Sequence, residues 1–291
     1  MSQTATAKGP GSVAEAGTDS AVAIIAPTTS NSEKILRVAV PVGMLVLAIV
    51  VWQVYVMATG TPKYILPSPV DVAGSLWTDW PTLFPALLVT VRITFSALIL
   101  ALIGGVGLAI VLVQSRWIEL ALFPFAVIMQ VTPIVAIAPL LLIYAPDTQT
   151  ALLICAFLVA FFPILSNMVQ GLKSVDHNLL NLFDLYGASR WQQLIYLKIP
   201  AAQPYFMAGL RIGGGLALIA AVVAEFAAGS AGAGSGLAFR LLESQYRLNI
   251  PRLFAALVLL TGTGVAIFGL TSLVAWLTLR RWHESAVKRE N

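Results

Sequence analysis

Runs of roughly 20 apolar residues recur along the chain, which is the length that an α-helix needs to cross the hydrocarbon core of a bilayer. Of the 291 residues, 58% are hydrophobic and only 10% are charged. Soluble domains carry about a quarter charged residues, so a soluble globule is excluded. The pattern predicts an all-α polytopic membrane protein, because a helix satisfies its own backbone hydrogen bonds in lipid.

Six runs qualify as transmembrane helices, and together they predict one membrane domain over residues 34–282. The predicted spans are 38–57, 93–113, 120–144, 151–169, 205–226 and 253–279. The first should stay in the membrane, because no signal-peptide pattern with a cleavage site precedes it. Residues 1–33 are rich in Ala, Ser, Thr and Gly and predict a disordered tail, and residues 283–291 a second tail.

The distribution of lysine and arginine predicts the orientation. With the amino terminus inside, the cytoplasmic side holds eleven of these residues: Lys8, Lys34, Arg37, Arg116, Lys173, Arg190, Lys198, Arg280, Arg281, Lys288 and Arg289. The other side holds five: Lys63, Arg92, Arg240, Arg247 and Arg252. Positive residues accumulate in cytoplasmic loops, so both termini are expected in the cytoplasm. The net charge of +4 then reflects orientation and requires no nucleic-acid partner.

The residues that usually carry chemistry are scarce. Cys155 is the single cysteine, and His177 and His283 are the only histidines, so neither a disulfide framework nor a metal centre is expected. No pair of carboxylates and no serine–histidine pair stands out within the predicted spans, which argues against an intramembrane enzyme. No catalytic residue is therefore predicted.

Four polar residues inside the predicted spans are candidates for a solute pathway or its gate. Gln130 and Thr132 adjoin Pro133, where a kink either serves packing or exposes polar groups to a pathway. Arg211 and Glu225 share the fifth span, about 21 Å apart along a helix. Arg211 is either a snorkelling residue near the cytoplasmic end or a pathway residue. Glu225 is either a helix-end group bonded to the next loop or part of a gate.

Residues 174–200 are patterned but too polar for a span. Asp176 predicts the start of a short helix, on which Leu179, Phe183 and Tyr186 share one face. Gly187 predicts the end of that helix.

A second short helix should follow, because Ser189 and Gln192 match a capping box. Trp191 lies within it, and Pro200 is expected to end it. An amphipathic pair on the lipid surface is one interpretation. The first helix, however, has no basic residue and carries Asp184, which favours a protein groove as its partner.

Other segments predict packing and interfacial structure. Residues 66–83 should form an interfacial helix with Trp77 and Trp80 in the headgroup layer. Residues 227–251 combine a glycine-rich stretch with a short amphipathic helix, either a dock for another protein or a solvated loop. Small residues at 209 and 213, and at 104 and 107, predict close helix packing.

The segment from Asn181 to Pro200, "NLFDLYGASRWQQLIYLKIP", resembles the cytoplasmic signature of permease subunits in binding-protein-dependent ABC importers. That signature has Glu-Ala-Ala, a glycine after three more residues, and Ile-x-Leu-Pro after a further nine. Gly187 and Pro200 fall at this spacing, whereas Asn181 replaces the acidic residue. The stretches "YILPSPVDV", "FFPILSNMVQGLKSVD", "GLRIGGGLALIAAVVAEF" and "AGAGSGLAF" are similar to permeases of the nitrate, sulfonate and taurine branch.

The resemblance covers residues 36–282 and implies a type I importer permease with six transmembrane helices and a pair of coupling helices. It implies a homodimer in the bacterial inner membrane, two ATP-binding cassette subunits that hold ATP and Mg²⁺, and an external or periplasmic solute-binding protein. No cofactor is expected on this chain. The residues implied in ATPase coupling are Leu179, Leu182, Phe183, Asp184, Tyr186, Gly187, Ala188, Trp191 and Pro200.

The absence of a G-x-x-x-x-G-K-[ST] phosphate loop means that any ATPase of that kind is a separate polypeptide. The expected solute is a small nutrient, either a sulfonate, nitrate or taurine-like compound or a pyrimidine or flavin-type heterocycle. An ion-coupled secondary transporter acting alone is the alternative. It should show inverted repeats and acidic residues at mid-membrane.

Overall fold

The computed structural model describes residues 31–229 and 234–280, and within these ranges it is helical without strands. The helices are α1 (Asn31–Thr59), α2 (Pro69–Thr78), α3 (Trp80–Gln114), α4 (Arg116–Val131), α5 (Ile134–Tyr144), α6 (Thr148–Lys173), α7 (His177–Leu185), α8 (Arg190–Gln193), the π-helical η1 (Leu194–Lys198), α9 (Ile199–Ala228), α10 (Leu237–Tyr246) and α11 (Ile250–Leu279). The predicted all-α membrane fold is confirmed. Nearly all of the two predicted tails lies outside the described residues.

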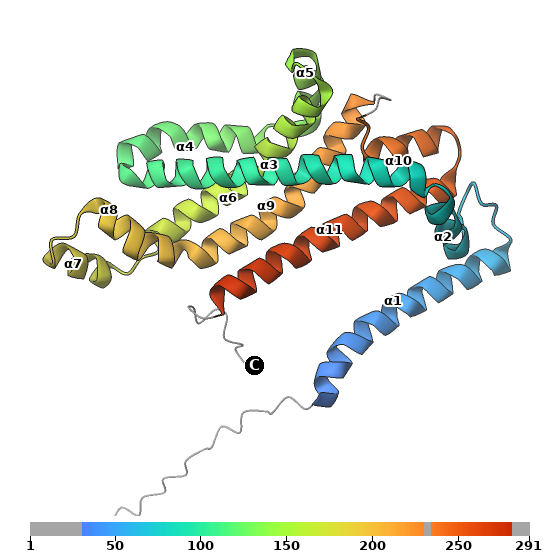
Figure 1. The fold of residues 1–291 in the computed structure, drawn as a ribbon, viewed down its shortest axis with the longest axis horizontal. Coiled ribbons are helices and arrows are strands. Elements are labelled where there is room, and N and C mark those ends of the chain that lie inside the picture. The colour runs from blue at the N-terminus through green and yellow to red at the C-terminus, as the bar shows by residue number, and fades with distance from the viewer. Residues whose placement is uncertain (1–30, 230–233, 281–291) are drawn as a thin grey trace, which may run out of the picture.

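The described helices provide six candidate membrane spans. Five are each long and apolar enough to span a membrane, and α4 with α5 qualifies as a broken sixth span. Lys173, at the end of α6, forms a salt bridge with Glu119 in the first turn of α4, which directly follows α3. Since α3 and α6 therefore end on the same side, α4 and α5 must carry the chain back across (Figure 1).

The third span, predicted over 120–144 with a kink at Pro133, is two helices and not one. It is bent by 98° between α4 and α5. Pro133 disfavours the helical conformation at the preceding residue, and Thr132 accordingly adopts φ −72° and ψ 123°. Pro124 and Pro139, by contrast, lie inside α4 and α5 without interrupting them. Of these three prolines, only Pro133 coincides with the break, and the residue before it has left the helical conformation.

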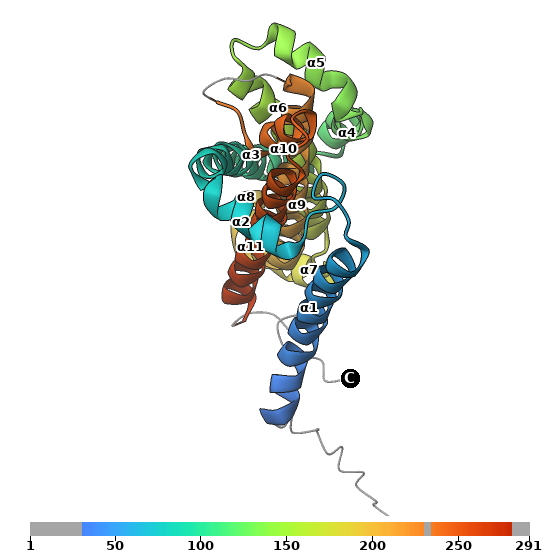
Figure 2. The same ribbon diagram turned by 90° about the vertical axis from the view of Figure 1, so that its right-hand side faces the viewer.

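Two other predicted boundaries change. Helix α3 begins at Trp80, thirteen residues before the predicted span, and so shortens the predicted interfacial helix to α2. Helix α1 stands away from the bundle, touching it through α2 and through Trp52, whose ring lies 5.7 Å from that of Phe254 on α11 (Figure 2). Trp77 on α2 is 87% exposed, in agreement with the headgroup position predicted for it.

Helices α6 and α9 form the most extensive contact of the bundle, and glycines make it close. A Cβ added at Gly209 would lie 2.9 Å from Asn167 Cβ, and one at Gly213 would lie 3.1 Å from the side chain of Ile164. The predicted packing role of this pair is confirmed. On α3, Gly104 faces Phe161 as expected, but Gly107 faces open space, and Gly105 makes the close approach instead.

The corner between α2 and α3 is tied to the start of α11 by an ion pair. Asp79 accepts hydrogen bonds from Arg252 and, at 2.6 Å, from Ser75 Oγ. The Arg252 guanidinium lowers the pKa of Asp79 below its ordinary value of 3.8. A carboxylate with a lowered pKa stabilises the fold above that ordinary value, and the contribution disappears as the pH falls through the lowered pKa.

We therefore expect Asp79→Asn to reduce the free energy of unfolding by about 1 kcal/mol at pH 7. The difference from wild type should persist to pH 5 and shrink between pH 4 and pH 2, as measured by thermal unfolding in detergent. In an Arg252→Gln background, Asp79→Asn should reduce the free energy of unfolding by much less. An undiminished loss in that background would contradict the assignment of the effect to this pair.

Candidate functional site

Helices α7 and α8 form an elbow at one end of the bundle, which is called the elbow below and comprises residues 176–198 (Figure 1). Asp176 caps α7 by accepting a hydrogen bond from the N–H of Asn178 at 2.8 Å. Gly187 turns the chain at φ +69°, a conformation that costs little only for glycine. Ser189 and Gln192 form the predicted capping box of α8.

Hydrogen bonds across the turn hold the two helices together. Gln193 Nε2 donates to Asp184 Oδ1 at 2.6 Å, and the N–H of Ala188 donates to the carbonyl of Phe183 at 2.9 Å. The elbow therefore has one defined geometry that local capping and a side-chain bridge fix together.

The elbow presents apolar side chains to its surroundings. No residue of α7 is buried. The exposed apolar residues include the predicted Leu179, Leu182, Tyr186 and Trp191, together with Leu185, Ile195 and Tyr196, which the predicted set omits. Leu182, Phe183, Tyr186, Gly187, Ala188, Gln192 and Tyr196 line a hollow of about 380 Å³. An exposed apolar patch of this kind marks an interaction surface.

Pro200 does not end the second short helix, contrary to the prediction. Helix α8 continues through the π-helical η1 into α9, so that Arg190–Ala228 is one helix of 39 residues. In η1, the N–H of Ile199 bonds to the carbonyl of Leu194, five residues back. This wider turn accommodates a proline that has no N–H of its own. The elbow is therefore directly joined to the most central span.

The four pathway candidates lie in three separate places. Gln130 and Thr132 are at the break between α4 and α5, where Thr132 Oγ1 donates to the carbonyl of Ile128 at 2.6 Å. Arg211 is exposed near the middle of α9, with its guanidinium 5.5 Å from the ring centroid of Phe268 on α11. Glu225 is buried near the far end of α9.

Glu225 joins three helices. Its Oε1 accepts a hydrogen bond from Thr90 Oγ1 of α3 at 2.8 Å, and its Oε2 accepts one from the N–H of Ala238 on α10 at 2.9 Å. The N–H of Leu237 donates to Thr90 Oγ1 at 2.9 Å. Gly236, at the start of α10, has no side chain to act as a cap, so Glu225 and Thr90 satisfy these amides instead.

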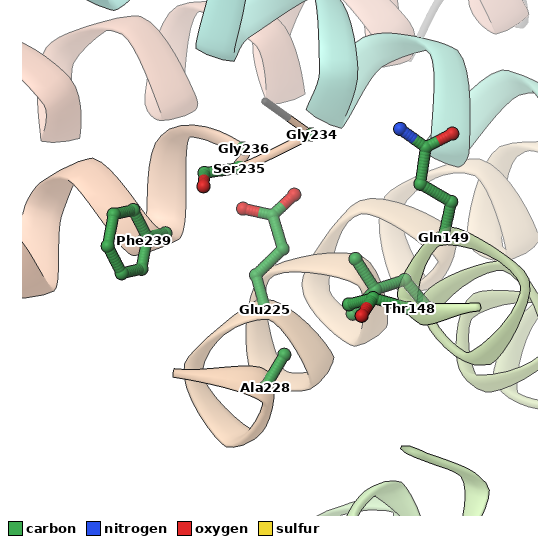
Figure 3. A pocket seen from close by; sticks show the side chains of 9 residues that line it. Thr148, Gln149, Glu225, Ala228, Gly234, Ser235, Gly236 and Phe239 are labelled. Atoms are coloured by element: carbon green, nitrogen blue, oxygen red, sulfur yellow. The ribbon is translucent and has the colours of Figure 1, made fainter. Parts of the chain in front are cut away.

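This buried cluster of Thr90, Glu225 and the start of α10 is called the Glu225 site. A cavity of about 100 Å³ adjoins it, lined by Thr148 and Gln149 of α6 and by Phe239 of α10 (Figure 3). Figure 3 shows the Glu225 carboxylate directed from α9 toward the backbone around Gly236. The bonded-loop interpretation of Glu225 agrees with this geometry. Thr90 was missed, because nothing in the sequence links positions 135 residues apart.

The described residues contain no group of three or more His, Cys, Asp or Glu side chains that could hold a metal ion. Cys155 is a buried free thiol in the core around α6. The features that stand out are thus an exposed elbow, a charged residue in the central span and a buried carboxylate at the opposite end.

Comparisons with known proteins agree with this arrangement. The family model described as binding-protein-dependent transport system inner membrane component matches residues 97–283. The riboflavin transport system permease protein RibX of Chloroflexus aurantiacus is 35% identical over 245 residues, covering 83% of this chain and 89% of that protein.

Two further relatives are named for different solutes. The formylaminopyrimidine transport permease protein ThiX of Halalkalibacterium halodurans is 29% identical, covering 78% of this chain and 90% of the relative. The nitrate import permease protein NrtB of Synechocystis is 30% identical, covering 78% and 83%. Together with the six-crossing bundle, these matches identify a multi-pass inner-membrane protein. The chain belongs to the family of permease components of binding-protein-dependent ABC importers.

Proposed function

We propose that two copies of this chain form the translocation pathway of an ATP-driven importer and that the elbow of each copy docks in a groove of a separate ATPase subunit. The observation that carries the proposal is the elbow itself, a fixed pair of short helices with exposed apolar side chains that continues into α9. A motion imposed on the elbow is transmitted to the span without an intervening loop.

The remaining parts of the importer follow from the family. ATP and Mg²⁺ are held by the ATPase subunits, because this chain has no phosphate loop. A solute-binding protein delivers the solute at the opposite end of the bundle, where α2 and α10 lie (Figure 1). ATP binding and the docked binding protein each bias the equilibrium between inward-open and outward-open states by their different affinities for the two.

The orientation follows from charge. Arg116, Lys173, Arg190 and Lys198 all lie at the elbow end of the bundle. Positive residues favour the cytoplasm, so the elbow faces the cytoplasm and both termini lie on that side. The solute is a small nutrient, either an oxyanion or sulfonate or a pyrimidine or flavin-type heterocycle, in keeping with the solutes for which the relatives are named.

The proposal is tested by purifying the tagged chain from its native membranes in a mild detergent and identifying its partners by mass spectrometry. One phosphate-loop ATPase per copy of this chain, with ATPase activity in the eluate, is the expected result. If the chain elutes alone and moves solutes into ATP-free liposomes, the secondary-transporter alternative replaces the proposal.

A further inference from the structure

Arg211 is a charged residue in the middle of a transmembrane helix, and its contacts with α6 show how deep it lies. Gly209 packs against Pro163 and Asn167 of α6, and Gly213 packs against Ile164 and Ala160. Arg211, which lies between the two glycines, is therefore level with the middle of α6. Along α9 it is about 20 Å from Lys198 and about 21 Å from Glu225.

The side chain of Arg211 is too short to bring its charge from this depth to either membrane surface. The hydrocarbon core is about 30 Å thick, so either surface is about 15 Å from its middle, more than a snorkelling arginine covers. Among the described residues, no carboxylate pairs with Arg211, and its recorded partner is the ring of Phe268. A charge in this situation faces protein or water, because facing lipid costs at least about 2.5 kcal/mol.

The side of α9 that carries Arg211 is exposed in the described part of the chain. Ala208, Ile212, Ile219 and Phe226 are exposed at helical spacing along it. A Cβ added at Gly215 would have no neighbour within 4 Å. The opposite side of the same helix is packed against α6 through Gly209 and Gly213. The uncovered stripe therefore runs past Arg211 through the depth of the membrane.

We propose that Arg211 is a charge filter halfway along the pathway, selecting a solute that carries a negatively charged group such as a nitrate, sulfonate, carboxylate or phosphate. This inference rests on the proposed function, since it needs a second copy to enclose water against the stripe. The guanidinium carbon lies 5.5 Å from the centroid of the Phe268 ring, within range of a cation–π contact on this side of α9. A fixed positive charge with low-dielectric walls concentrates anions and repels cations.

The filter is tested with thiol reagents that need no knowledge of the solute. In a Cys155→Ala background, Gly215→Cys places a thiol one helical turn from Arg211, in open space. Ala208→Cys does the same on the other side. The complex purified with its ATPase is placed in lipid nanodiscs and treated with anionic sulfonatoethyl or cationic trimethylammonioethyl methanethiosulfonate. Rates are normalised to a free thiol.

The anionic reagent is expected to react faster than the cationic one at both positions. Arg211→Gln should lower the anionic-to-cationic rate ratio by about tenfold or more, and Arg211→Lys should preserve it. Ile103→Cys is the control, because Ile103 is exposed on α3 at the same depth, adjoining Gly104, which faces Phe161. That position should react slowly with both reagents, because the proposal places the water on the α9 stripe and leaves Ile103 against lipid.

Equal reactivity at the stripe and at Ile103→Cys would overturn the inference, because α9 would then be no more hydrated than an ordinary span surface. A rate ratio that is unchanged by Arg211→Gln would overturn it as well. Either result, obtained with an ATPase still bound to the chain, refutes the filter and leaves the importer intact. Failure to recover any ATPase refutes the proposed function instead.

Discussion

Replacement of Gly187 by tryptophan is expected to lower ATPase co-purification by about tenfold or more while the spans stay folded. Gly187 sits at φ +69°, where a side chain is strained, and it lines the hollow of the elbow. A Cβ at this position meets nothing within 4 Å among the described residues, so the indole would project toward the docked protein. Loss of one central contact of 1.4 kcal/mol already costs tenfold in affinity.

Gly60→Trp is a closely matched control for this experiment. Gly60 also has a positive φ, +59°, and also faces open space, but it lies between α1 and α2. The Gly60→Trp variant should leave the ATPase bound, and it measures how far backbone strain alone reduces the stability of the chain. Normal co-purification of the ATPase by the Gly187→Trp variant would contradict the docking role of the elbow.

The second large effect is expected at the Glu225 site. Glu225→Gln keeps the shape of the side chain but has one accepting oxygen for two donors, Thr90 Oγ1 and the N–H of Ala238. A buried donor left without its acceptor costs about 1–3 kcal/mol. Amide hydrogen exchange at the start of α10 should therefore accelerate by about 5- to 150-fold, as measured by mass spectrometry of peptides covering residues 234–249.

Glu243→Gln makes the same chemical change on the same helix. Glu243 pairs with Arg240 at 2.9 Å and with Arg247 at 3.0 Å, in pairs that reach solvent, and such pairs contribute about 0–1 kcal/mol. Its effect on exchange at the start of α10 should be much smaller. Equal acceleration in the two variants would show that Glu225 does not hold α10 in place.

The parts of the elbow that the sequence predicts correctly are set by neighbours within a few residues. Asp176, Gly187 and the pair of Ser189 and Gln192 act through local hydrogen bonds or backbone conformation, so their roles are visible without the fold. Apolar run length predicts the spans for the same reason, because a helix satisfies its backbone within the segment itself.

Prolines and tertiary contacts were harder to predict. The effect of Pro133 depends on whether Thr132 leaves the helix, and the effect of Pro200 depends on whether a π-turn forms before it. The local sequence pattern does not indicate which of these backbone conformations forms. The depth of Arg211 depends on which residues of α6 face its neighbouring glycines, and the partners of Glu225 come from α3 and α10. Sequence spacing alone contains neither relation.

Because α8, η1 and α9 are continuous, the elbow and the Glu225 site lie at the two ends of one helix. Near its middle it packs closely on α6 through Gly209 and Gly213, about 30 Å from Arg190 and about 20 Å from Glu225. A rod that pivots near its middle swings its ends in opposite directions. A tilt of about 5° would move the elbow end by about 3 Å one way and the opposite end by about 2 Å the other. A single tilt of this helix would thus widen one end of the pathway while it narrows the other.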